Sequence, residues 1–159
     1  MGNWCVVSSR KFPQIGAMNF NKYVQTGEAF VREIAVEVGC PDDVAKAGRV
    51  LRSVLHALRN QSTPEECFQL ISQLPMQIKA VFVDGWRISG KGQRVRNIDD
   101  FIANVMDADG VSEWDDFPTE VETITAIKSV FRVIQKHVSE GEVEDFRRTL
   151  PEALRPLLR

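Results

Sequence analysis

The sequence has few of the side chains from which metal and redox sites are built. It contains two histidines and three cysteines, and no two cysteines form a C-x-x-C pair. Cys5, Cys40 and Cys67 are widely spaced, and with so few histidines they provide no zinc-ligand pattern. We therefore predict no metal site and no cofactor. Cys67 lies on an apolar helical face and is expected to be a reduced thiol in a reducing cytoplasm.

Long apolar runs and a surplus of basic residues are also missing. No apolar run approaches the roughly 20 residues that span a bilayer, and none near the N-terminus is long enough for a secretion signal. The formal net charge is −2, whereas proteins that bind nucleic acid usually show a basic surplus. These absences favour a globular protein without a membrane span, and they argue against nucleic acid as its partner.

The charges that are present are segregated along the chain. Residues 84–96 carry a net charge of +3, whereas residues 97–159 carry −7. The acidic stretch 99–122 holds nine acids and no base, but it lacks the glycine and glutamate spacing of an EF-hand loop. We interpret this stretch as a solvated face with charges at helix starts. A weak cation site or contact with a basic partner is the alternative.

The chain contains two copies of one helical pattern. The segments "TPEECFQLISQLPMQIKAVF" (63–82) and "SEGEVEDFRRTLPEALRPLL" (139–158) superpose at a constant offset of 76 residues. Each copy opens on Thr or Ser with Glu three residues later, which is the capping box that starts a helix. Each copy also carries a Leu-Pro pair, where proline ends one helix and starts the next. The same offset carries the apolar face of 50–58 onto that of 126–134.

These patterns predict an all-α fold, a pseudo-symmetric helical bundle built from two related repeats of about four helices each. The repeats span residues 18–83 and 97–159, and a basic linker, 84–96, joins them into a single helical domain, 18–159. The predicted helices cover residues 20–38, 43–60, 64–74, 76–83, 98–108, 119–138, 140–150 and 152–158.

The basic linker raises the question of phosphate binding. Its segment "GWRISGK" (85–91) fits G-x-x-x-x-G-K, but position 92 is glycine where a P-loop needs a magnesium-binding hydroxyl, and no parallel sheet is predicted. A linker between helical repeats is the favoured interpretation. The alternative is an anion-binding or nucleic-acid-binding segment, with Trp86 or Trp114 available for stacking or partner contact. Its basic residues are Arg87, Lys91, Arg94 and Arg96.

Five segments stand out in order along the chain: "NKYVQTGEAFVREIAVEVG", "RVLRSVLHALR", "QLPMQIKAVFVDGW", "IDDFIANV" and "VSEGEVEDFRRTLPEALRPLL". They resemble the bacterial family named domain of unknown function 2267, from about residue 18 to the end. The resemblance implies an all-α fold of two related halves. It implies no activity, so no catalytic residue is carried over. Residues 1–17 lie outside it and are expected to form a tail, with Met18 as a candidate natural start.

No set of nucleophile, base and orienting group can be assembled from the spacing, so no catalytic residue is predicted. The favoured function is a non-enzymatic helical interaction or regulatory module of a bacterial cell. Its segregated charge would select a protein partner or drive self-association. The alternative is a phosphate, nucleotide or nucleic-acid binder through the basic linker, and an enzyme of unknown type comes third.

Overall fold

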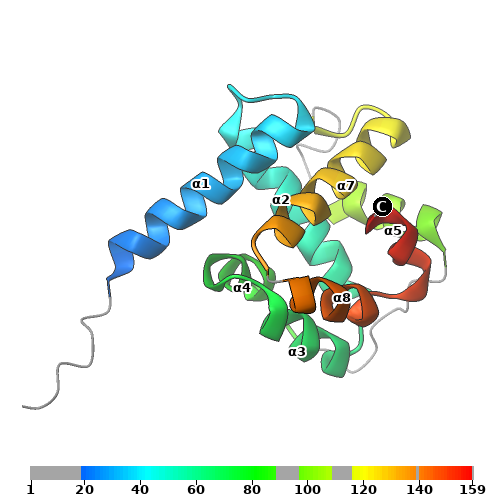
Figure 1. Ribbon diagram of the computed structural model, residues 1–159. Helices are drawn as coiled ribbons and strands as arrows, with labels where there is room; N and C mark the ends of the chain where they lie inside the picture. The colour runs from blue at the N-terminus through cyan, green and yellow to red at the C-terminus, as the bar shows by residue number, and fades with distance from the viewer. Residues whose placement is uncertain (1–18, 89–96, 109–115, 139, 159) are drawn as a thin grey trace, which may run out of the picture.

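The computed structural model describes residues 19–88, 97–108, 116–138 and 140–158. Across these ranges the chain is helical and contains no strand, which confirms the all-α prediction (Figure 1). Each predicted helix is present, with ends within two residues of those expected. The helices are α1 (Phe20–Val38), α2 (Val44–Asn60), α3 (Pro64–Gln73), α4 (Met76–Val83), α5 (Ile98–Ala108), α7 (Glu120–Lys136), α8 (Glu140–Thr149) and η2 (Glu152–Leu158).

The helix ends follow from local hydrogen bonding. At the start of α3 the predicted capping box is complete, since the Thr63 hydroxyl accepts from the Glu66 amide at 3.2 Å and the Glu66 carboxylate accepts from the Thr63 amide at 2.8 Å. The matching box at 139–142 involves Ser139, which lies outside the described residues. The last element, η2, is a 3₁₀ helix with Pro156 inside it. Inside an α-helix the proline ring would clash with the carbonyl four residues earlier, which disfavours an α-helical turn here.

The core forms around two central helices, α2 and α7. The apolar faces that the sequence predicts on them are buried, and the remaining helices pack around them. Helix α2 packs against α1, α4, α5 and α7. Helix α7 also packs against α1, α5 and η2. The remaining principal pairs are α1 with α4, α3 with α8 and α8 with η2.

Helix α1 has two different environments along its length. Its C-terminal half packs against α2 and α7, and at Gly27 it lies against α4, whereas its first turns extend away from the other helices (Figure 1). Of the helices described, none is both long enough and apolar enough to cross a membrane.

Candidate functional site

The described start of the predicted basic linker is a turn held against the helical body. Trp86 is half-buried, and its ring meets those of Phe68 and Phe82 edge-on at centroid distances of 6.1 and 6.3 Å. Packing of this kind fixes the indole in the helical body. Arg87 follows it in the chain and is exposed to solvent. Four predicted site residues lie outside the described residues, and their roles stay predictions: Lys91, Arg94, Arg96 and Trp114.

Arg59 on α2 fixes the position of this turn. Its guanidinium group is buried and donates to the carbonyl oxygens of Phe82 at 2.9 Å and of Asp84 at 2.8 Å. Carbonyls at the end of a helix have no partner within the helix and carry the negative end of its dipole. A buried cation is stabilised there because it donates hydrogen bonds to these carbonyls and because its positive charge lies at the negative end of the dipole. Burial lowers the pKa of Arg59, but a guanidinium remains charged in proteins.

Two further side chains of α2 support the same helix end. His56 Nε2 lies 3.0 Å from the Val81 carbonyl, and Arg52 forms an ion pair with Asp84 at 3.0 Å. A carbonyl only accepts hydrogen bonds, so the His56 hydrogen is on Nε2. Burial lowers the pKa of His56 below its ordinary value of 6.5, and the neutral ring is the form that the fold accommodates. Residues 81–86 are thus anchored to α2 by three side chains.

The start of the 85–91 segment does not fit a P-loop, and residues 89–91 lie outside the described residues. A P-loop needs a strand that delivers the glycine-rich turn to the N-terminus of a helix. Here the residues before Gly85 form α4, and Gly85 adopts a left-handed φ of 64° just after that helix ends. The C-terminal end of a helix repels anions, whereas a phosphate site requires the opposite end.

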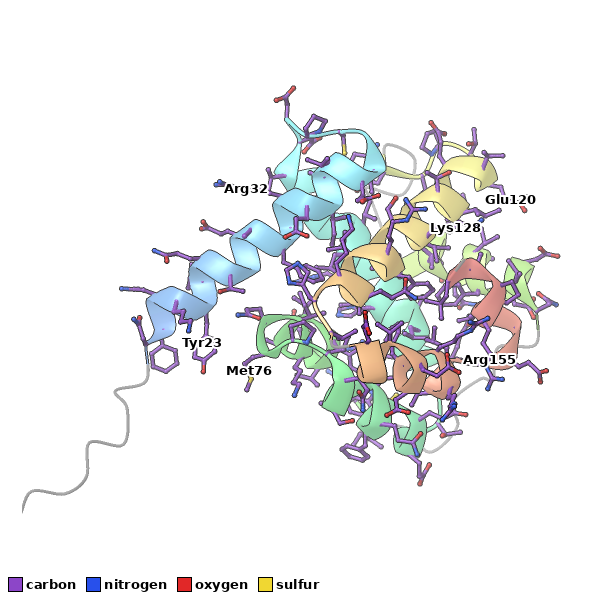
Figure 2. All side chains as sticks on the ribbon, in the orientation of Figure 1. Tyr23, Arg32, Met76, Glu120, Lys128 and Arg155 are labelled. Atoms are coloured by element: carbon purple, nitrogen blue, oxygen red, sulfur yellow. The ribbon has the colours of Figure 1, made fainter. Side chains whose placement is uncertain are left out.

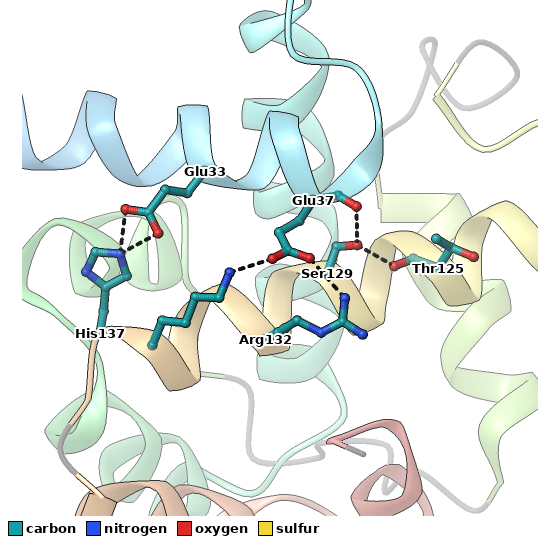
Figure 3. A network of polar contacts seen from close by, with 7 residues as sticks. Glu33, Glu37, Thr125, Ser129, Arg132 and His137 are labelled. Atoms are coloured by element: carbon teal, nitrogen blue, oxygen red, sulfur yellow. Dashed lines mark hydrogen bonds and ion pairs between the residues drawn. The ribbon is translucent and has the colours of Figure 1, made fainter.

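A second polar cluster joins α1 to α7, and the sequence did not reveal it. Glu37 accepts hydrogen bonds from Arg132 at 2.9 Å and from Lys136, while Glu33 meets His137 at 3.0 Å (Figure 3). The hydrogen bonds from Lys136 and Arg132 hold the pKa of Glu37 below its usual range. Like charges at i, i+4 were the available signal, acidic on α1 and basic on α7, but only the fold brings together two helices about a hundred residues apart.

The cluster acts as a brace and not as a reactive centre. The ring of His137 also packs on Phe30, with centroids 4.9 Å apart, and the Ser129 hydroxyl lies 3.1 Å from the Glu37 carbonyl. Each of these groups is engaged with a neighbour on the facing helix. Beside the brace, an open depression of about 550 Å³ runs along the outer face of α1, lined mainly by charged and small side chains.

Part of the predicted acidic stretch is also used in packing. The Asp116 carboxylate is 1% exposed and accepts two hydrogen bonds from Arg49 on α2, at 2.6 and 2.9 Å. A buried carboxylate in a bidentate pair with arginine is a structural tie between distant segments. Across the described ranges, no group of three or more His, Cys, Asp or Glu side chains could hold a metal ion.

An apolar stripe on α1 is exposed to solvent. Phe20, Tyr23 and Val24 are 68%, 41% and 57% exposed, although they lie on the same helical face as the buried Phe30 and Ile34. We call Phe20, Tyr23 and Val24 the α1 stripe. Met76 at the start of α4, the helix that packs beside α1, is 58% exposed and lies near Tyr23 in Figure 2. Helical periodicity predicts the apolar face of α1. It does not predict which part of that face the other helices cover and which part stays exposed.

The fold and these sites define an all-helical protein whose buried polar groups tie helices together and whose first helix presents an uncovered apolar surface. The chain belongs to the family described as an uncharacterized conserved protein (DUF2267), whose model matches residues 27–157. The family resemblance seen in the sequence is therefore confirmed. A comparison with curated proteins found no match.

Proposed function

We propose that this chain is a cytoplasmic, non-enzymatic helical module that binds a protein partner through the α1 stripe. One observation carries the proposal. Phe20, Tyr23 and Val24 continue the apolar face that α1 buries in the core, yet they are exposed where α1 extends beyond the body. Contiguous exposed apolar side chains on a rigid element mark protein-binding surfaces.

The brace between α1 and α7 supports this role. Glu33 and Glu37 attach the C-terminal half of α1 to α7 by ion pairs and hydrogen bonds. The N-terminal half continues the same unbroken helix, so its stripe is held in a defined direction from the body. A preorganised binding element loses less conformational entropy when its partner docks.

We further propose that the single domain 18–159 consists of two related repeats, 18–83 and 97–159. The packing pairs support this reading. The exchange that relates the two repeats replaces α1 by α5, α2 by α7, α3 by α8 and α4 by η2, and the reverse. It converts the α1–α2 pair into α5–α7, the α1–α7 pair into α2–α5, and the α2–α4 pair into α7–η2. The pairs α2–α7 and α3–α8 are converted into themselves. The pairs α1–α4 and α8–η2 have no counterparts among the principal packing pairs, and the extension of α1 gives the first repeat the stripe.

Site-specific photocrosslinking in cells tests the proposed function. A photoreactive amino acid is placed at Val24, on the α1 stripe, and in a matched control at Gln25, which is exposed on the other side of the same helix. We expect protein adducts from position 24 and few from position 25, whatever the partner is. Equal labelling from both positions, or none from position 24, would remove the support for a binding surface there.

Anion binding by the basic linker is the second candidate, and one observation favours it. Arg87 is exposed immediately after a turn that three α2 side chains hold in place, so any site that includes it has one fixed end. Thermal-shift measurements with pyrophosphate, Mg-ATP and short nucleic acids provide the test. A saturable rise in melting temperature that is lost in the Lys91→Glu, Arg94→Glu double variant would support this function. No rise with any of these ligands would reject it.

A further inference from the structure

We propose that the partner on the α1 stripe is a second copy of this chain, bound antiparallel so that two α1 helices form a two-fold dimer. This inference rests on the proposed function and narrows it to one partner. Closed two-fold dimers are the commonest assemblies of soluble proteins, and they require a surface that is complementary to itself.

The path of α1 selects the antiparallel orientation. From Phe30 onward the apolar face of α1 is covered by the chain's own helices, and Gly27 lies against α4, whereas residues 20–24 stand clear of the other described helices. A parallel partner would place its body against the same side of the helix and collide with the first body. An antiparallel partner whose residues 20–27 face the same residues of the first copy places the two bodies at opposite ends of the helix pair.

The side chains on the stripe complement one another in this orientation. With the two-fold axis between Tyr23 and Val24, each of these residues faces the other across the axis, and Phe20 of one copy lies level with Gly27 of the other. Gly27 is the point where α1 approaches α4 closely, since a Cβ there would lie 3.4 Å from Gln77. The ring of Phe20 would therefore reach the start of α4, where Met76 offers a sulfur–aromatic contact.

The charges in the paired segment permit self-association. Residues 20–27 contain a single charged residue, Lys22, which points away from the stripe, so two copies bring no run of like charges together.

The area available suits a reversible dimer. From their exposed fractions, Phe20, Tyr23, Val24 and Met76 present at most roughly 500 Å² of surface per chain, so the pair would bury at most about 1,000 Å² through them, at the lower limit for a specific interface. We therefore expect the dimer to form in the micromolar range of concentration and to be sensitive to one charged substitution.

Sedimentation velocity on the full chain, from low to high micromolar concentration, tests the proposal. The chain has a mass of 18.0 kDa, and we expect the weight-average mass to approach twice that value as concentration rises. Val24→Glu should remain monomeric at all concentrations. Val121→Glu is the matched control, because Val121 is a valine on α7 that is 73% exposed, more than Val24 at 57%, and this variant should dimerise like the unchanged chain.

Both valines are exposed, so unchanged melting temperatures would show that the variants fold. A wild-type chain that stays monomeric, or a Val24→Glu variant that still dimerises, would overturn the inference. Photocrosslinking at Phe20 in a mixture of isotope-labelled and unlabelled chains tests the orientation. Mixed adducts to the region of Gly27 and Met76 are expected, whereas mixed adducts between the two Phe20 positions would overturn the antiparallel arrangement.

The failure of this inference can be told apart from the failure of the proposed function. A monomeric chain whose position 24 crosslinks to a different protein overturns the dimer and leaves the interaction module standing. A monomer in which position 24 crosslinks to residues 1–18 of its own chain identifies that segment as the occupant and overturns the second copy. A monomer without adducts overturns both.

Discussion

At the scale of single residues, His56 shows how burial and hydrogen bonding set a protonation state. Its ring lies against the end of α4, where its Nε2–H donates to the Val81 carbonyl. Burial is the largest influence on its pKa, and the nearby Arg52 and Arg59 also disfavour a second proton. The neutral ring therefore belongs to the folded state, and protonation opposes folding.

The pH dependence of stability follows from this state. Because the folded pKa of His56 is below 6.5, the unfolded chain binds more protons between the two pKa values. The contribution of His56 is fully present above about pH 6.5 and is lost as the pH falls through the folded value. His56→Gln keeps an N–H donor but cannot titrate. We expect its melting temperature to decline less between pH 7 and pH 5 than that of the unchanged chain. Parallel curves for the two proteins would contradict this account.

At the scale of single elements, the helix ends were predictable because local chemistry fixes them. The box at Thr63 and Glu66 and the proline at 75 lie within a few residues of the ends that they set, so the sequence alone locates them. The partners of those helices were not predictable. Arg59 bonds carbonyls 23 and 25 residues away, and Glu37 meets Lys136 across 99 residues. Periodicity shows which face of a helix is buried, but not which helix covers it.

The capping box at α3 provides a prediction at this scale. In Thr63→Ala, the Glu66 amide loses its acceptor at the start of the helix, and we expect the free energy of unfolding to fall by about 1 kcal/mol. Thr125→Ala is the matched control, because Thr125 is exposed inside α7, where alanine has the higher helix propensity. Chemical denaturation should therefore show no loss of stability for the control. Equal losses in both variants would mean that the box does not stabilise α3.

At the scale of the whole molecule, the two halves of the chain interlock. Helix α1 packs on α7, α2 packs on α5, and α3 packs on α8, so each half completes the core of the other. Arg49 and Asp116 form a buried tie across the same junction. Repeated sequences usually suggest units that stack as neighbours. Here each half of the chain also packs its helices against those of the other half.

This interlocking predicts a single cooperative unit. The full chain should show one thermal transition, with calorimetric and van't Hoff enthalpies that agree. Fragments 19–88 and 97–158 expressed alone should lack a cooperative transition and should regain one when mixed, because the surfaces that bury α1 and α2 are supplied by α7 and α5. A fragment that melts cooperatively by itself would show that a repeat folds independently.

Modification of the buried Cys67 thiol can report local opening of this protein. Its side chain has no exposed surface, its Sγ lies 3.5 Å from the Arg59 carbonyl, and burial raises its pKa to about 11. Thiol reagents attack the thiolate, so the closed protein offers them almost no target at neutral pH. Each modification of Cys67 therefore records a moment when α3 has separated from the end of α2. The labelling rate of Cys67 therefore reports how often that junction opens, and no cysteine has to be introduced to measure it.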